Sequence, residues 1–137
     1  MASSKAVIVM CTFLTVSCVS PQGVAPSGIF SVVDDVPNKM FALEYRNNSN
    51  KAMCLSPSTW PNVNGNIPLT SADISVSING KIFILDTFGE YCPDCHFRVA
   101  PKAALKAHLN YSDFKIPSKL VAIHKELHLS PKAVICS

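Results

Sequence analysis

Apolar and polar residues alternate along much of this chain, a pattern typical of strands that bury one face. The clearest case is Met40–Arg46, in which every second residue is aromatic or aliphatic. In Ile74–Ile78 aliphatic residues alternate with serine, and Asn79-Gly80 follows directly. Because an Asn-Gly pair adopts the positive φ angles of a two-residue hairpin turn, we predict a β-hairpin over Ser71–Leu85. The residues expected to be buried in these strands are Phe41, Leu43, Tyr45, Ile74, Val76 and Ile78.

Shorter apolar runs predict the remaining strands. Ile29–Val33 has the pattern of an edge strand, and Lys51–Leu55 that of a strand returning after the turn-forming cluster Asn47–Asn50. Near the end of the chain, Glu126–Leu129 and Ala133–Cys136 have the length and composition of two more strands.

One segment supports two structures. Pro101 could open a helix, since proline is favoured at the first helical position. Every second residue from 103 to 111 is instead apolar, and these five residues would share one strand face, so we favour a strand. A short helical turn is expected over Ser118–Lys125. The apolar members of the alternating segment are Ala103, Leu105, Ala107, Leu109 and Tyr111.

About seven short strands, with turns spaced 8–12 residues apart, predict an all-β fold and most simply a β-sandwich. The strand-first order, the Asn-rich turns and the late strand after an apolar-Pro loop resemble immunoglobulin-like extracytoplasmic domains. This resemblance implies an immunoglobulin-like β-sandwich over residues 29–137 and no particular activity.

The first twenty residues have the layout of a secretory signal. Lys5 supplies a positive charge, Ala6–Val16 is apolar apart from two threonines, and small residues follow. This run is shorter than the roughly 20 residues that a membrane-spanning helix needs. We therefore expect a cleaved signal at residues 1–20, a flexible linker at residues 21–28, and a secreted or periplasmic domain. The run Thr15–Cys18 also resembles a bacterial lipobox, which would make Cys18 a lipidated membrane anchor.

Charge is unevenly distributed along the chain, whose net charge is +3. Residues 21–95 hold four basic and seven acidic residues, whereas residues 96–137 hold seven basic and two acidic ones. A basic C-terminal part could bind an anionic partner, but we favour the interpretation that the two parts complement each other within one fold. No basic cluster alternates with aromatic residues, so nucleic acid is not an expected partner.

The mature region contains Cys54, Cys92, Cys95 and Cys136. An even number of cysteines in an exported chain predicts two disulfides. Of the three possible connectivities we favour Cys54–Cys136 with Cys92–Cys95, and the crossed pairings stay open. The long bridge would close a loop of about 80 residues, which is worth about 4 kcal/mol if its effect lies in chain entropy.

The close cysteine pair also permits redox chemistry. The run Ile84–Cys95 is similar to the active-site entry of thioredoxin-like proteins, where an apolar strand, an acid and an aromatic residue precede Cys-x-x-Cys. The resemblance implies a thiol–disulfide oxidoreductase with Cys92 as the nucleophile and Cys95 as the resolving thiol. Tyr91 stands where that family has tryptophan, and Ile116-Pro117 comes earlier than its cis-proline loop, so we keep this function as the alternative.

A metal-binding envelope protein is a second alternative. The run Cys92–His96 holds three possible ligands, and zinc would need a second paired set. His124 and His128 would share one face of a helix, but a strand over Glu126–Leu129 would break that arrangement. Because an oxidising compartment favours the disulfide, we expect no metal and no other cofactor.

Common catalytic signatures are missing from the sequence, namely G-x-S-x-G, the phosphate-binding loop and H-E-x-x-H. We therefore expect a non-catalytic exported domain, inhibitor-like or with a role in assembly, that binds a protein in the envelope or extracellular space. The long loop Ser56–Pro68 carries the single tryptophan, which either covers the core or contacts a partner. The candidate binding surface consists of Trp60, Tyr91, Arg98, Lys102 and Lys106.

Overall fold

The structure, a computed structural model, describes residues 20–25, 28–67, 74–87 and 96–137. Within these ranges the chain is mostly β, with three small antiparallel sheets and two short 3-10 helices, η1 (Tyr111–Phe114) and η2 (Ser118–Leu120). The largest sheet has the order β1-β2-β3-β8 and contains β1 (Ser20–Ala25), β2 (Gly28–Asp35), β3 (Met40–Asn47) and β8 (Ala104–Asn110). The second, β10-β4-β7, contains β4 (Met53–Leu55), β7 (Phe97–Val99) and β10 (Ala133–Ile135). The third, β6-β5-β9, contains β5 (Ser75–Ile78), β6 (Lys81–Ile84) and β9 (Glu126–His128).

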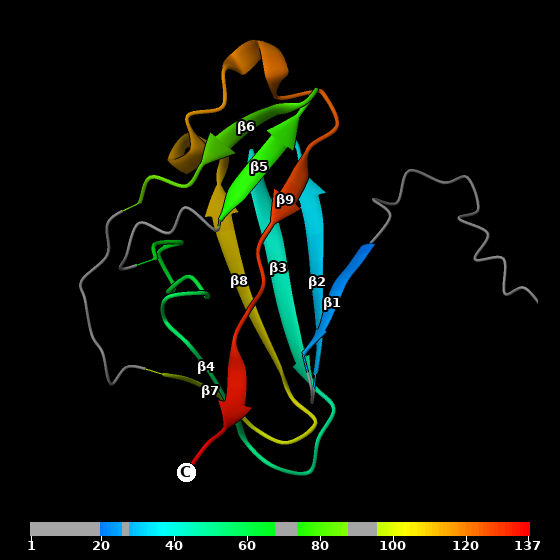
Figure 1. The fold of residues 1–137 in the computed structure, drawn as a ribbon, viewed down its shortest axis with the longest axis vertical. Coiled ribbons are helices and arrows are strands. Elements are labelled where there is room, and N and C mark those ends of the chain that lie inside the picture. The colour runs from blue at the N-terminus through cyan, green and yellow to red at the C-terminus, as the bar shows by residue number, and fades with distance from the viewer. Residues whose placement is uncertain (1–19, 26–27, 68–73, 88–95) are drawn as a thin grey trace, which may run out of the picture.

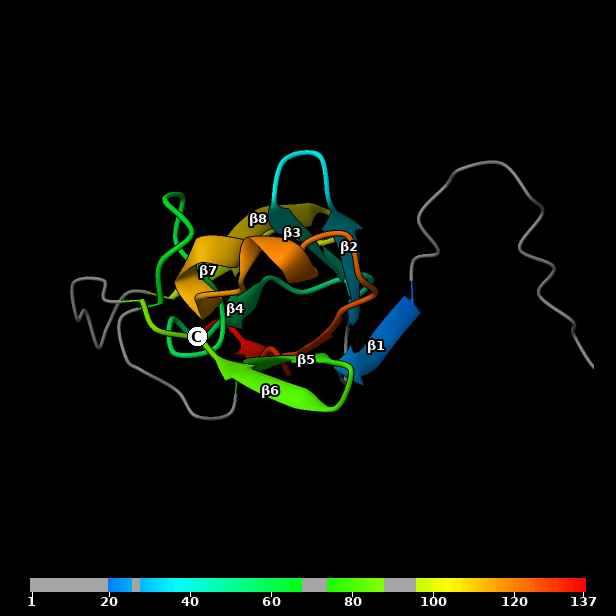
Figure 2. The same cartoon turned by 90° about the horizontal axis from the view of Figure 1, so that it is seen from above.

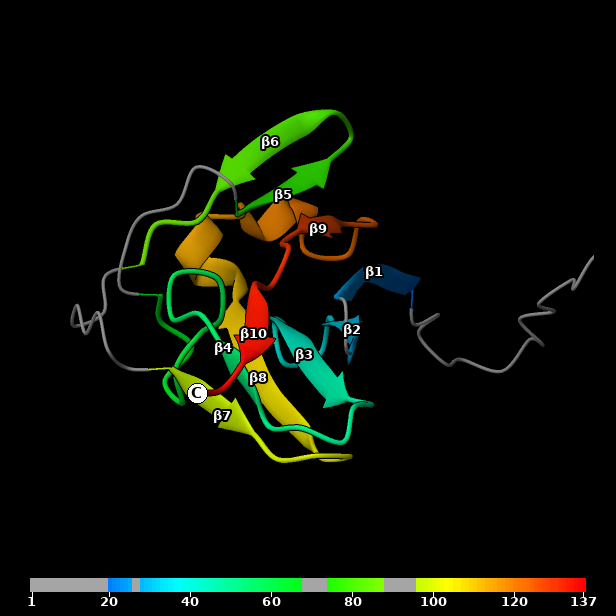
Figure 3. The same cartoon turned by 60° about the horizontal axis from the view of Figure 1, so that its bottom comes forward.

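The sheets enclose one apolar core. Seen from above, β2, β3 and β8 lie on one side of the molecule and the β5–β6 hairpin on the other (Figure 2). The last part of the chain passes through both small sheets, since β9 leads directly into the segment that ends in β10 (Figures 1 and 3). The predicted all-β class is therefore confirmed. The buried residues of the core include Phe30, Phe41, Leu43, Tyr45, Leu55, Trp60, Val76, Ile78, Leu109 and Leu127.

The alternating segments form the strands that the sequence predicts. Phe41, Leu43 and Tyr45 of β3 are at most 2% exposed, because β3 lies between β2 and β8 with this face toward the core. The ambiguous segment is a strand, β8, which pairs with β3 from Asn110 to Ala104. Its apolar face points inward as predicted. Leu105 and Ala107 are partly buried, and Leu109 is fully buried.

The predicted hairpin is also confirmed in the described part of its range. β5 and β6 pair antiparallel across Asn79 and Gly80, which have φ angles of 49° and 80°. Both central residues thus adopt the left-handed conformation that a two-residue type I′ turn requires. Ile74, Val76 and Ile78 face the core and are buried.

Two strand placements differ from the prediction. Ile29–Val33 lies within β2, which is not an edge strand because β1 and β3 flank it. The strand after the Asn-rich turn does not return onto β3 but pairs, as β4, with β7 and β10. The fully buried Asn47 accounts for this path, because its amide nitrogen donates to the carbonyl oxygens of Lys51 at 2.8 Å and Val99 at 3.1 Å. These bonds turn the chain away from β3 and into the next sheet.

Part of the predicted signal and linker lies within the described residues. Ser20–Ala25 forms β1, which pairs with β2 along its length, with a shift in register between Pro21 and Gly23. The irregularity occurs at a proline because proline lacks the N–H that a regular ladder needs. Residues 1–19, which carry the predicted signal, lie outside the described residues, as does most of the predicted redox run.

Candidate binding surfaces

Trp60 belongs to the core and not to the surface. Its side chain is 1% exposed and makes edge-on contacts with Phe30 and Tyr45, at ring-centroid distances of 5.9 and 6.5 Å. The expectation that Trp60 covers the core is correct, and its place in the predicted binding surface is wrong. The loop around it folds back because Asn62 accepts backbone N–H groups at its side-chain oxygen, at 2.9 and 3.0 Å.

The basic residues of the predicted surface are exposed but lie on separate elements. Arg98 is on β7, opposite Cys54 of β4, whereas Lys106 is on β8, opposite Glu44 of β3. Lys102 lies in the turn between these strands and donates to the carbonyl oxygen of Asn48 at 2.6 Å. Of the predicted surface, these three basic residues are therefore exposed, whereas Trp60 is buried. Tyr91, its remaining member, lies outside the described residues.

Cys54 and Cys136 form a disulfide in the structure, with a Cα–Cα distance of 5.2 Å and a sequence separation of 82. This is the long bridge that the sequence analysis favoured. Cys92 and Cys95, like Cys18, lie outside the described residues, so the second bridge, the redox pair and the lipid anchor stay predictions. In the part of the chain that the structure describes, no three His, Cys, Asp or Glu side chains gather in a way that could hold a metal ion.

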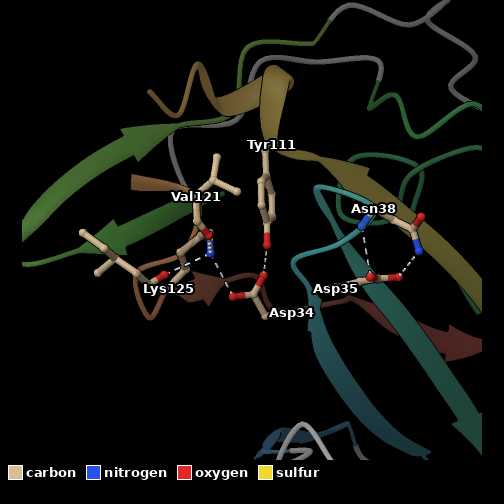
Figure 4. Close-up of polar contacts among 7 residues, drawn as sticks. Asp34, Asp35, Asn38, Tyr111, Val121 and Lys125 are labelled. Carbon is tan, nitrogen blue, oxygen red and sulfur yellow. Dashed lines mark hydrogen bonds and ion pairs between the residues drawn. The ribbon is translucent and has the colours of Figure 1, made fainter. Parts of the chain in front are cut away.

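An ion pair between a buried lysine and a partly exposed aspartate joins distant parts of the chain (Figure 4). The Lys125 side chain is fully buried, and its ammonium nitrogen lies 3.1 Å from Asp34 Oδ2. It also donates to the carbonyl oxygens of Val121 at 2.6 Å and Ile123 at 3.0 Å. These bonds use all three ammonium hydrogens. Lys125 therefore has no hydrogen left for a ligand, and we interpret the pair as a structural clamp.

Tyr111 completes this cluster. Its hydroxyl donates to Asp34 Oδ1, and the Lys125 ammonium lies 4.6 Å from the centre of its ring. Burial, together with the hydrogen bond to Asp34, raises the pKa of Tyr111 well above its usual range. The phenol is thus a fixed donor at physiological pH. Sequence reasoning missed the cluster, although Asp34 is in phase with the buried Phe30 and with Val32, which packs against the core, and this phase marks an inward-pointing acid.

The charged clusters explain the uneven distribution of charge along the chain. Lys125 and Lys115, from the basic part, pair with Asp34 and Asp86, from the acidic part. The Lys115–Asp86 pair is exposed, with Nζ 2.6 Å from Oδ2, and Asp86 raises the pKa of Lys115. Both contacts support the interpretation that the two parts complement each other within one fold.

A cavity of about 340 Å³ lies beside the buried cluster, between the β2–β3 turn and the two 3-10 helices. Its volume is near the lower end of the range for small-molecule sites. The Tyr111 hydroxyl is already donated to Asp34, so this phenol offers the cavity no free proton. The lining residues are Asn38, Lys39, Asn110, Tyr111, Ser112, Ile116, Ser118 and Val121.

Strand β6, at one edge of the β6-β5-β9 sheet, exposes apolar side chains. Ile82 and Ile84 of β6 are 56% and 52% exposed, and they lie on the solvent-facing side of the hairpin, opposite Ser77 and Ser75. Among the described residues, β6 pairs with β5 alone and is the edge of its sheet (Figure 1). An apolar edge strand of this kind is a template for pairing with another chain.

The hydrogen-bond pattern of the hairpin shows which backbone groups face outward. The Leu85 N–H donates to the Ile74 carbonyl at 3.0 Å, so these residues form a hydrogen-bonded pair. Such pairs alternate along an antiparallel ladder. The backbone N–H and C=O groups of Phe83 therefore face β5, whereas those of Ile82 and Ile84 point away from the sheet.

Searches against protein-family models, curated proteins and solved structures find no match to this chain. None of the helices in the described residues has the length and apolar character needed to cross a membrane. Inferences about function therefore depend on the geometry of the chain itself.

Proposed function

We propose that the protein is an exported, non-catalytic binding domain of the immunoglobulin-like sandwich type. Its site is the free edge of β6, on which an extended segment of a protein partner adds as a further antiparallel or parallel strand. The observation that carries the proposal is the pair of exposed isoleucines, Ile82 and Ile84, on an edge strand whose outward backbone groups are unpaired among the described residues.

The backbone and the side chains of β6 serve two purposes in this mode of recognition. The outward N–H and C=O groups of Ile82 and Ile84 supply hydrogen bonds to any extended segment, which gives affinity. Their side chains favour a segment with apolar residues at alternating positions on the same face, which gives specificity. The partner is therefore a protein with an exposed apolar strand or an extended tail.

Export is supported by features at opposite ends of the chain. The first twenty residues resemble a secretory signal. A disulfide such as Cys54–Cys136 forms in oxidising compartments. We propose the periplasm or the extracellular space as the location on these grounds.

The experiment separates the backbone of β6 from its side chains. The Ile84→Pro variant removes an outward N–H without removing a bond to β5, a position where edge strands tolerate proline. Ile84→Thr is the matched control, since it keeps the N–H and the branched Cβ. A photoreactive residue at Ile82, introduced into the protein in its native host, should form an adduct with one partner in the Ile84→Thr background.

The proposal predicts that the adduct is lost in the Ile84→Pro background while the far-UV circular dichroism and the unfolding free energy change little. Equal adduct yields in the two backgrounds would show that β6 does not accept a strand. A Phe83→Pro variant, which removes an inward N–H, should instead damage the hairpin and lower the unfolding free energy.

A further inference from the structure

The C-terminal strand β10 has few contacts of its own. It pairs with β4 over three residues at the edge of its sheet, and Val134 and Ile135 are 61% and 56% exposed. Beyond that ladder, the Ser56 N–H donates to the Lys132 carbonyl at 2.9 Å and the Cys136 N–H donates to the Ala52 carbonyl at 3.0 Å. Because β10 buries so little apolar surface, its noncovalent attachment to the sheet is weak.

The disulfide attaches β10 covalently to β4. Cys136 follows β10 directly, and its partner Cys54 is the central residue of β4. The strand covered by β10 contains Met53 and Leu55, which are core residues at 2% and 0% exposure. A departure of β10 would therefore open a backbone edge that belongs to the core.

The start of β10 is also connected to the tryptophan loop. The Lys132 N–H donates to the Thr59 hydroxyl at 2.9 Å, and its carbonyl accepts the Ser56 N–H at the other end of the same turn. Trp60 follows Thr59 directly. A movement of β10 would therefore disturb the loop that holds Trp60, the only tryptophan of the chain, which packs against Phe30 and Tyr45.

We propose that the Cys54–Cys136 disulfide is a redox-sensitive latch that keeps β10 on β4, and that its reduction opens the β4 edge as a second docking site. A dithiol reductant, small or protein-borne, donates two electrons and two protons. The S–S bond breaks, two thiols form on the protein, and the dithiol becomes a disulfide. The released strand leaves β4 free for an extended segment with the chemistry of β10, small and aliphatic in the order Ala-Val-Ile.

This inference goes beyond the proposed function, because it concerns a different sheet and does not depend on β6. The β6 edge is open in the oxidised protein, whereas the β4 edge becomes available only after reduction. The two sites would therefore be used under different redox conditions.

The first test compares the oxidised full-length protein with the Cys54→Ser/Cys136→Ser variant. We expect a red shift of Trp60 emission and stronger acrylamide quenching in the variant. Amide exchange at Ser56 and Cys136 (serine in the variant) should accelerate at least about tenfold more than exchange at Phe83 of the β5–β6 hairpin. The combination reports local release of β10 with the rest of the fold intact.

Two results would overturn the latch. Unchanged Trp60 emission and unchanged exchange at position 136 would show that hydrogen bonds alone retain β10. Accelerated exchange at Phe83 to the same extent as at position 136 would show global unfolding, which is not a local switch.

The second test probes the β4 edge directly with a synthetic peptide of residues 131–137, PKAVICS. In a glutathione redox buffer, the Cys136→Ser variant should form a mixed disulfide between Cys54 and the peptide, identified by peptide mapping. A peptide of the same composition in scrambled order is the control, and we expect about tenfold less capture at Cys54. Equal capture of the two peptides would contradict strand docking at this edge.

Discussion

The two three-stranded sheets are attached to the molecule in different ways. The β6-β5-β9 sheet is built on a hairpin whose strands are joined by two residues, and its third strand follows the buried Lys125–Asp34 clamp. In the β10-β4-β7 sheet the edge strand comes from the far end of the chain and is joined by a disulfide between residues 82 positions apart. The first sheet depends on local turn chemistry and a buried ion pair, and the second on a covalent bond.

This difference decides which edge is permanently available. β6 stays in place because the hairpin turn determines its register, so its exposed isoleucines can serve a partner without destabilising the sheet. β10 exposes apolar residues as well, but its place on β4 depends on Cys136. Under the two proposals, similar exposed strands have opposite roles, β6 as a docking edge and β10 as a removable cover.

The disulfide should have the largest effect on stability. The Cys54→Ser/Cys136→Ser variant is expected to lose about 4 kcal/mol of unfolding free energy, because the unfolded chain regains the entropy of a loop of about 80 residues. Urea unfolding of the oxidised protein and of the variant measures the difference. A loss below about 1 kcal/mol would mean that the covalent attachment of β10 contributes little.

The buried clamp should rank next. Lys125→Met is expected to lower the unfolding free energy by about 3 kcal/mol, because Asp34 keeps a charge whose buried partner is gone. Lys115→Met is the matched control, since it removes a lysine from an exposed pair and should change stability little. Similar losses in the two variants would contradict the assignment of Lys125 as a clamp.

Alkaline pH offers a test of the same cluster. Because the pKa of Tyr111 is raised in the folded protein, the folded state keeps this proton where the unfolded chain has lost it. Its stabilisation is complete below about pH 10 and declines as the pH rises above that value. The wild type should exceed Tyr111→Phe by about 1.5 kcal/mol at pH 8, and the gap should narrow toward pH 11. A gap that stays constant would show that the phenol does not titrate with folding.

The hairpin turn should give the smallest loss. Gly80 has a φ angle of 80°, and a Cβ at this position would meet no atom within 4 Å, so the only penalty in Gly80→Ala is backbone strain. We expect a loss of about 1 kcal/mol, measured by urea unfolding, with no change in exchange at the amide of Cys136. A change there would mean that the two small sheets are coupled.

The sequence is informative wherever structure depends on local pattern. Alternation identified β3, β5 and β8 with their buried faces, and Asn79-Gly80 identified the hairpin. It was less informative about strand neighbours, because the turn of the chain from β3 toward β4 and β7 involves the bonds of one buried side chain, Asn47, to the backbone of Lys51 and Val99. No local pattern reports such long-range contacts.

The candidate sites show the same division. The favoured partner of Cys54 followed from cysteine number and position, whereas Trp60 could be a lid or a contact residue on sequence alone. The Asp34–Lys125 clamp joins residues 91 positions apart, so only the fold brings them together. The open edge of β6 likewise depends on where the sheet ends, which alternation does not reveal.

Residue-resolved hydrogen exchange tests the central claim most directly, namely that β6 is an open edge that accepts a strand. In the isolated protein, the amides of Ile82 and Ile84 should exchange fast and that of Phe83 slowly. When the partner identified by cross-linking is added to the unmodified protein, the amides of Ile82 and Ile84 should become protected, while exchange at Phe83 should not change. Protection of Ile82 and Ile84 in the isolated protein, or no change when the partner binds, would contradict the account.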